Sequence, residues 1–210
     1  MGVTRGFPHL SLIREALRVL IPRLRRGELP TIGSATWQGW KEYDTANAVV
    51  SAQHLARSIC ELYRLRVGVV VVSFDSTLDG AGRIEIGPSR DFFVEVHERF
   101  RRDPQRLAQI LGHEIAHIFL REHGLERGET LANEVLTDTT AAVYGFGALM
   151  ADSFEVNVRR EQVEGGVRVI TSEQHIGYLT PDEIGYVLCR GGFGDILGEL
   201  QSSAARRAFR

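Results

Sequence analysis

The sequence His113-Glu114-Ile115-Ala116-His117 gives the pattern H-E-x-x-H within an apolar stretch of a 210-residue chain. Two histidines at i and i+4 lie on one face of a helix, where both imidazole rings can reach a single Zn²⁺ ion. The glutamate beside the first histidine can then take a proton from a water molecule on that ion. The stretch therefore predicts a helical zinc site, with His113 and His117 as ligands and Glu114 as the general base. The alternative is a buried helix with two hydrogen-bonded histidines.

Helix signals flank this pattern on both sides. Asp103 is a suitable N-cap, Pro104 suits the first helical position, and Gly124 is a suitable stop. Apolar residues recur at helical spacing, namely Leu107, Ile110, Leu111, Ile115, Ile118 and Phe119. We expect one buried helix between Asp103 and Gly124, whose low-dielectric surroundings strengthen the charge interactions of a metal site.

A catalytic zinc ion usually has three protein ligands, and His123 is one candidate for the third. Its spacing from His117 is similar to that of the third histidine of the metzincins, but Leu120 stands where that family has a glycine. If the helix continues, six residues turn the chain by about 600° and carry it about 9 Å along the axis, so His123 points away. A histidine that interacts with the dipole at the helix C-terminus is the simpler interpretation.

Glu134 is the other candidate, because Thr130 can cap a second helix that contains it. Glu134 and Asp138 are four residues apart and share one helix face. Glu134 could complete a His₂Glu zinc site, while Asp138 could accept a hydrogen bond from a ligating histidine and fix its tautomer. An exposed acidic helix face is the alternative, and the neighbouring H-E-x-x-H pattern argues against it.

H-E-x-x-H followed by N-E-x-x-T-D resembles the gluzincin metallopeptidases, of which the thermolysin-like enzymes are the best-known group. The resemblance covers residues 103–138. It implies Zn²⁺ as the cofactor, Glu114 as the general base and Asp138 as the partner of a ligating histidine. The zinc ligands that it implies are His113, His117 and Glu134.

The chain is shorter than thermolysin-like enzymes and has no room for their flanking domains. Compact peptidases of the ImmA/IrrE type, which cut transcriptional regulators, have a similar order: a short sheet, the H-E-x-x-H helix and a glutamate-bearing helix. After Asp138 the chain departs from that family. The resemblance implies an α+β, zincin-like fold with a short, mainly antiparallel sheet packed on the two helices.

Periodicity and turn signals predict the remaining elements. The expected helices are 9–21, 45–64 and 193–209, the expected strands are Val67–Phe74, Arg83–Ile86 and Phe92–His97, and Val156–Arg160 with Val167–Thr171 form a hairpin. We divide the chain into an N-terminal helical segment with a linker (1–44) and a zincin-like domain (45–210). Phe92–His97 is either an edge strand that binds an extended substrate or a core strand.

Thr180, Pro181 and Glu183 form a capping box at the start of another helix, with Leu179 and Ile184 as its hydrophobic staple. Nearby, His175 and Tyr178 have no structural role in this scheme. A zinc peptidase gains from a donor aimed at the developing oxyanion, and either residue could supply it. Tyr144 and His97 are weaker candidates for the same role.

Composition limits the functions that the chain can have. A net charge of −2 argues against a general role at nucleic acid or a membrane surface. Cys60 and Cys189 form no disulfide framework, and the apolar run Val67–Phe74 is too short to span a bilayer. We therefore expect a cytoplasmic zinc metallopeptidase whose partner is a protein or peptide substrate, in an oligomeric state that the sequence does not define. The alternatives are a zinc hydrolase of a non-peptide amide and a non-catalytic zinc-stabilised sensor or binding module.

Overall fold

The computed structural model describes residues 6–30, 37–86, 90–153, 155–163, 166–174 and 176–192. The helices are α1 (Leu10–Arg25), α2 (Ala48–Leu62), α3 (Pro104–Glu122), α4 (Thr130–Ala141), α5 (Gly147–Asp152) and α6 (Pro181–Gly191). The strands are β1 (Val70–Asp75), β2 (Gly82–Ile86), β3 (Phe92–His97), β4 (Glu155–Val163) and β5 (Gly166–Gln174). Short helical segments are η1 (Gly39–Glu42), η2 (Thr45–Asn47), η3 (Glu98–Phe100) and the π-helical η4 (Ala142–Phe146). The class is α+β, as predicted.

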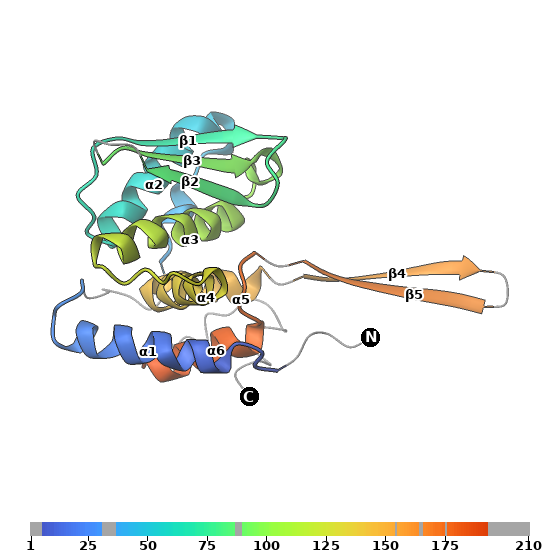
Figure 1. The fold of residues 1–210 in the computed structure, drawn as a ribbon. Helices are drawn as coiled ribbons and strands as arrows, with labels where there is room; N and C mark the ends of the chain where they lie inside the picture. The colour runs from blue at the N-terminus through green and yellow to red at the C-terminus, as the bar shows by residue number, and fades with distance from the viewer. Residues whose placement is uncertain are drawn as a thin grey trace.

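Figure 1 shows the elements in layers, with the β1–β3 sheet at one end, α3 beneath it, α4 next, and α1 with α6 at the opposite end. The strand order is β1-β3-β2, in which β3 pairs in parallel with β1 and antiparallel with β2. The sheet is therefore mixed, and the prediction of a mainly antiparallel sheet is wrong for it. Of the two interpretations of Phe92–His97, the core strand is the one observed, because β3 has a neighbour on each side.

The helix that carries H-E-x-x-H begins and ends at its predicted signals. The Asp103 carboxylate accepts a hydrogen bond from the backbone N–H of Arg106 at 3.1 Å, and Pro104 occupies the first turn. Gly124 adopts a φ of 61°, the left-handed conformation that ends a helix. At α4 the predicted cap is wrong, since Glu129 and not Thr130 accepts from the backbone N–H of Ala132.

A cluster of buried aromatic rings holds α3 against the segment that follows α4. Tyr63 contacts the rings of Phe119, Tyr144 and Phe146, and its hydroxyl donates to the carbonyl of Gly112 at 3.1 Å. A Cβ on Gly112 would lie 2.7 Å from the Phe146 ring, so only glycine allows this close approach. Because Gly112 precedes the first histidine of the motif, this packing fixes where that histidine leaves the helix.

The N-terminal helix packs against α4 and α6, and Ile13 and Leu20 are fully buried in the same core as the sheet. α1 extends past the predicted end at residue 21 and contains Pro22. Its last turn persists because Leu24 packs on the core and Arg26 N–H donates to the Pro22 carbonyl at 3.1 Å.

Two C-terminal predictions are confirmed. α6 begins with the capping box, in which Thr180 accepts from Glu183 N–H and the Glu183 carboxylate accepts from Thr180 N–H. β4 and β5 form the antiparallel hairpin, which extends away from the body of the molecule in Figure 1. The expected helix 193–209 lies outside the described residues. Among those that are described, no helix is both long and apolar enough to cross a membrane, and both cysteines are free.

Candidate metal centre

The three predicted metal ligands meet where α3 faces α4. His113 and His117 leave α3 one turn apart, and Glu134 reaches them from α4. The His113 Nε2 atom lies 3.2 Å from His117 Nε2 and 3.2 Å from Glu134 Oε2, and His117 Nε2 lies 3.5 Å from the same oxygen. Three ligands at the usual 2.0–2.1 Å from a tetrahedral zinc ion would be about 3.3–3.4 Å apart. The donor set therefore fits a zinc ion in both chemistry and spacing.

Asp138 determines which nitrogen of His113 faces the cluster. Its Oδ1 atom lies 2.7 Å from His113 Nδ1, and the carboxylate is almost fully buried. A carboxylate only accepts hydrogen bonds, so Nδ1 carries the proton and donates it. In the neutral ring, the Nε2 lone pair of His113 then points toward His117 and Glu134.

Thr137 determines which nitrogen of His117 faces the cluster, a role that the sequence analysis did not assign to it. The Thr137 hydroxyl donates to the carbonyl of Asn133 at 2.8 Å, so its oxygen is free to accept from His117 Nδ1 at 3.2 Å. The Asn133 side-chain nitrogen lies 3.4 Å from the same ring nitrogen, but it is itself a donor, because the Asn133 oxygen accepts from the backbone N–H of Arg127; it therefore cannot accept from His117 Nδ1. The pattern N-E-x-x-T-D could have indicated this role of Thr137, because Asn133 and Thr137 are four residues apart on the helix face beside Glu134.

The resulting electrostatics require a positive charge inside the cluster. With both Nδ1 atoms donating, neither neutral ring has a proton on Nε2, and two lone pairs face each other and a carboxylate. Burial disfavours a charged His113, but hydrogen bonds to Asp138 and Glu134 outweigh it and raise the pKa of His113 well above its usual value. Burial likewise opposes ionisation of Glu134, yet hydrogen bonds from His113 and His117 lower its pKa to about 2. Either a proton or a metal cation supplies the missing charge.

Glu114 lies beside the cluster and outside the ligand set. Its side chain is buried against β2, where a Cβ on Gly82 would approach Glu114 Oε1 to 2.9 Å and Ile110 Cγ2 to 2.5 Å. Burial raises the pKa of Glu114, and the two histidines lower it in part. A carboxylate with a raised pKa is a stronger base than an exposed one, as a general base requires. Gly82 thus leaves the space that Glu114 occupies, a role that the sequence did not indicate.

Tyr178 belongs to a loop that is bonded to the same aspartate. The backbone N–H groups of Tyr178 and Leu179 donate to Asp138 Oδ2 at 2.5 and 3.1 Å. Gly177 precedes them with a φ of 96°, and a Cβ there would lie 2.7 Å from that oxygen. Partial burial and then the charges of Glu134 and Asp138 raise the pKa of Tyr178, whose ring is 43% exposed. The structure therefore places Tyr178 next to the site.

The other predicted candidates lie elsewhere. His175 is outside the described residues. Tyr144 is buried in the core and donates to the carbonyl of Pro30, and His97 caps the backbone N–H of Arg99. His123 lies 2.8 Å from the carbonyl of Phe119 and is not part of the described metal-ligating cluster.

No protein-family model, curated protein or solved structure matches the chain. The chemistry of the site is therefore interpreted from its own geometry.

The first prediction concerns metal content. The purified protein should hold about one zinc ion per chain, consistent with a single three-ligand site. His113→Ala and His117→Ala should abolish binding in isothermal titration calorimetry, and Glu134→Gln should weaken it strongly. His123→Ala is the matched control and should bind normally. Loss of zinc in the control together with binding in Glu134→Gln would contradict the ligand assignment.

The second prediction concerns the residues that orient the rings. Asp138→Asn should weaken zinc binding by about 10–100-fold, as is usual when the hydrogen-bond partner of a ligating histidine is removed. Thr137→Val should weaken it too, because His117 Nδ1 loses its acceptor. Thr139→Val is the control, since the Thr139 hydroxyl makes the same i−4 bond, to the Val135 carbonyl at 2.7 Å. Equal zinc affinity in the two threonine variants would show that Thr137 does not position His117.

Proposed function

We propose that the chain is a zinc-dependent metallopeptidase of the gluzincin type, with His113, His117 and Glu134 as its metal ligands. One observation carries the proposal: two imidazoles oriented by Asp138 and Thr137 turn unprotonated nitrogens toward a carboxylate. A buried glutamate stands beside them without belonging to the ligand set. A purely structural zinc site has no need of that glutamate.

Zinc bound by these residues would activate water and polarise a carbonyl group. Glu114 takes the proton of the attacking water and later delivers it to the leaving amine. The raised pKa of Glu114 favours the first of these steps, because a carboxylate with a higher proton affinity takes a proton more readily. Tyr178 is the candidate donor to the developing oxyanion among the described residues, and His175 remains a candidate from the sequence.

The free edge of β2 supports a peptide as the substrate. His97 N–H donates to the Ala81 carbonyl at 3.0 Å, so in this antiparallel pair residues 81, 83 and 85 turn their backbone groups toward β3. Gly82 and Ile84 then turn theirs outward, and neither has a hydrogen-bond partner outside the sheet among the described residues. Because Gly82 also touches Glu114, an extended chain paired with β2 would run past the general base.

The opposite edge of the sheet is closed to strand addition. On β1 the backbone N–H and carbonyl of Val72 are both bonded to the side-chain amide of Gln53, at 2.9 and 2.7 Å. This amide occupies the groups that an added strand would need. The position that we assign to the substrate is therefore β2, in place of β3, for which the sequence left a substrate-binding edge strand and a core strand open.

The two alternatives to a peptidase are weakened by separate observations. A non-catalytic zinc module would not need the buried carboxylate of Glu114 beside the ligands. A non-peptide amide substrate would not pair with the free edge of β2. We place the reaction in the cytoplasm, in keeping with two free cysteines, and regard a transcriptional regulator as the first substrate to examine.

The third prediction tests the chemistry. Glu114→Gln should keep its zinc and its fold but lose about 10²–10⁴-fold in turnover, the usual contribution of a general base. The measurement is mass-spectrometric mapping of new N-termini after the zinc-loaded protein is incubated with a cell proteome. Glu122→Gln, an exposed change on the same helix, is the control and should cleave normally.

Two results would contradict the proposal. Undiminished cleavage by Glu114→Gln would exclude Glu114 as the base. If the zinc-loaded wild-type protein produced no new N-termini, the binding-module alternative would replace the peptidase.

The fourth prediction tests the β2 edge. A peptide that spans a mapped cleavage site is resynthesised with one backbone N-methyl group at each position in turn. N-methylation removes a donor, so kcat/KM should fall by about tenfold at alternate positions, following the two-residue period of a strand. A uniform response along the peptide would exclude pairing with β2.

A further inference from the structure

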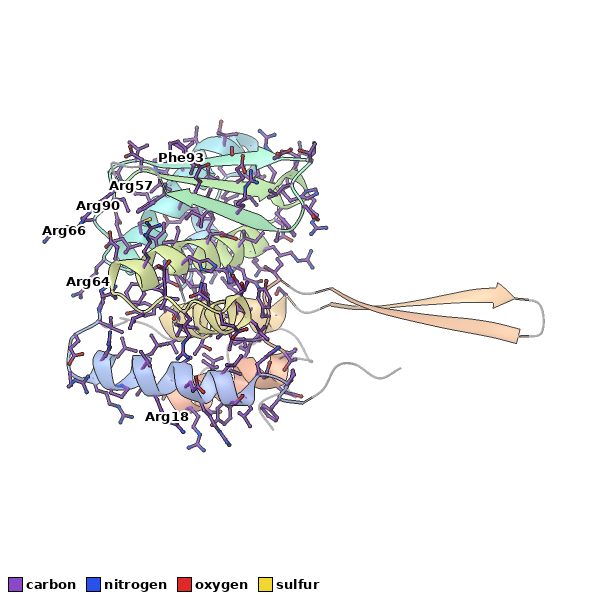
Figure 2. The ribbon with its side chains drawn as sticks, in the orientation of Figure 1. Arg18, Arg57, Arg64, Arg66, Arg90 and Phe93 are labelled. Atoms are coloured by element: carbon purple, nitrogen blue, oxygen red, sulfur yellow. The ribbon has the colours of Figure 1, made fainter. Side chains whose placement is uncertain are left out.

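A cluster of arginines lies at the end of the molecule where the sheet begins. Arg64 and Arg66 follow α2, Arg57 lies within its last turns, and Arg90 precedes β3. Figure 2 shows these four residues along one side of the molecule, whereas Arg18 lies on α1 at another side. We call Arg57, Arg64, Arg66 and Arg90 the arginine surface.

Backbone and packing contacts connect parts of this surface. The backbone N–H of Gly68 donates to the carbonyl of Arg90 at 3.1 Å, which joins the segment after Arg66 to the start of β3. Arg57 borders a hollow of about 170 Å³ between α2 and the segment 67–70. The hollow therefore lies next to Arg57, and Gly68 at its rim is bonded to the backbone of Arg90.

Exposed apolar side chains accompany the charges. Val69 borders the hollow and is 55% exposed. Val71 and Phe93 pair across β1 and β3 and are 37% and 44% exposed. The hollow is too small for a drug-sized ligand but has room for an apolar side chain of a larger partner. Arginine together with aromatic and apolar groups is the composition of a protein-binding surface.

The arginines of this surface outnumber the carboxylates beside them, of which Asp91, next to Arg90, accepts from the backbone N–H of Val69 at 2.9 Å. Across the described part of the chain, no ion pair involves Arg57, Arg64, Arg66 or Arg90. The backbone of Arg64 and Arg90 adopts φ angles of 53° and 59°. These are the only described non-glycine residues with positive φ, a conformation in which glycine or asparagine would be less strained. Both strained positions thus carry a guanidinium group that forms no ion pair among the described residues.

We propose that the arginine surface binds an acidic segment of a partner protein, with an apolar side chain of that segment in the hollow beside Val69. The guanidinium groups pair with carboxylates of the segment. A protein suits this surface better than a nucleic acid, because the exposed side chains of Val69, Val71 and Phe93 accompany the arginines, and a phosphate backbone offers them no apolar partner.

The arginine surface shares no residue with the metal cluster, so its test does not depend on catalysis. The probes are short fluorescent peptides in which acidic residues flank one central position, occupied by leucine or by alanine. Fluorescence anisotropy should show salt-dependent binding to the full-length protein, tighter for the leucine peptide. An oligothymidine of similar length is the competing probe.

The variant Arg64→Asn/Arg66→Ser/Arg90→Asn should weaken binding of the leucine peptide by about tenfold or more, whereas the wild-type preference for leucine should vanish in Val69→Ser. Asparagine is chosen at the two strained positions because it tolerates positive φ. The control Arg18→Ser/Arg25→Ser/Arg102→Ser removes the same charge from exposed positions elsewhere and should bind normally.

Three results would overturn the proposal. They are absence of peptide binding by the wild-type protein, equal weakening in both triple variants, and tighter binding of the oligothymidine through the same arginines.

Discussion

The carboxylate of Asp138 is the contact on which the arrangement of the site depends. One of its oxygens orients His113 on α3, and the other accepts the backbone N–H groups of Tyr178 and Leu179. Three parts of the chain that are distant in sequence therefore meet at one buried anion. Burying a carboxylate is costly unless its oxygens are hydrogen-bonded, so removal of any one partner would weaken the other contacts. The contact with Asp138 also requires a glycine before Tyr178, because a side chain at Gly177 would occupy the space of the carboxylate.

The ring orientations have a consequence for stability. Asp138 and Thr137 hold both imidazoles with their unprotonated nitrogens toward Glu134, in a place that is largely shielded from water. Such a cluster is unfavourable as neutral rings and becomes favourable when it binds a cation. In the metal-free protein a proton on His113 fills this need, in line with the raised pKa of that residue. The cluster is thus arranged to hold a positive charge, which either a proton or a metal cation could supply.

Local signals in the sequence were sufficient for the helices of the site. H-E-x-x-H, Asp103-Pro104 and Gly124 define α3 through contacts within a few residues. Glu134 and Asp138 share a face because α4 is a helix, whatever else surrounds it. The place of β3 could not be predicted in the same way. Its alternation of buried Phe92 and exposed Phe93 is the same in a central strand and an edge strand, and only long-range pairing with β1 and β2 distinguishes them. Gly82 and Gly177 were missed for a related reason, since what each glycine avoids lies in another part of the chain.

The two edges of the small sheet differ in whether a further strand can pair with them. The difference depends on which helix lies beside each edge. α2 contacts β1 and places Gln53 on the backbone of Val72, so that edge is closed to an added strand, and the exposed Val69 lies just before it. α3 contacts β2 and brings Ile110 and Glu114 next to Gly82, whose backbone groups have no hydrogen-bond partner outside the sheet in the described part of the chain. The open edge is thus the one next to the metal cluster. A mixed sheet of three strands allows one closed and one open edge. β3 pairs with both edge strands, so its own backbone groups are not available to a further strand. Substrate pairing and partner binding, as proposed, would then use opposite sides of one rigid element without competing for residues.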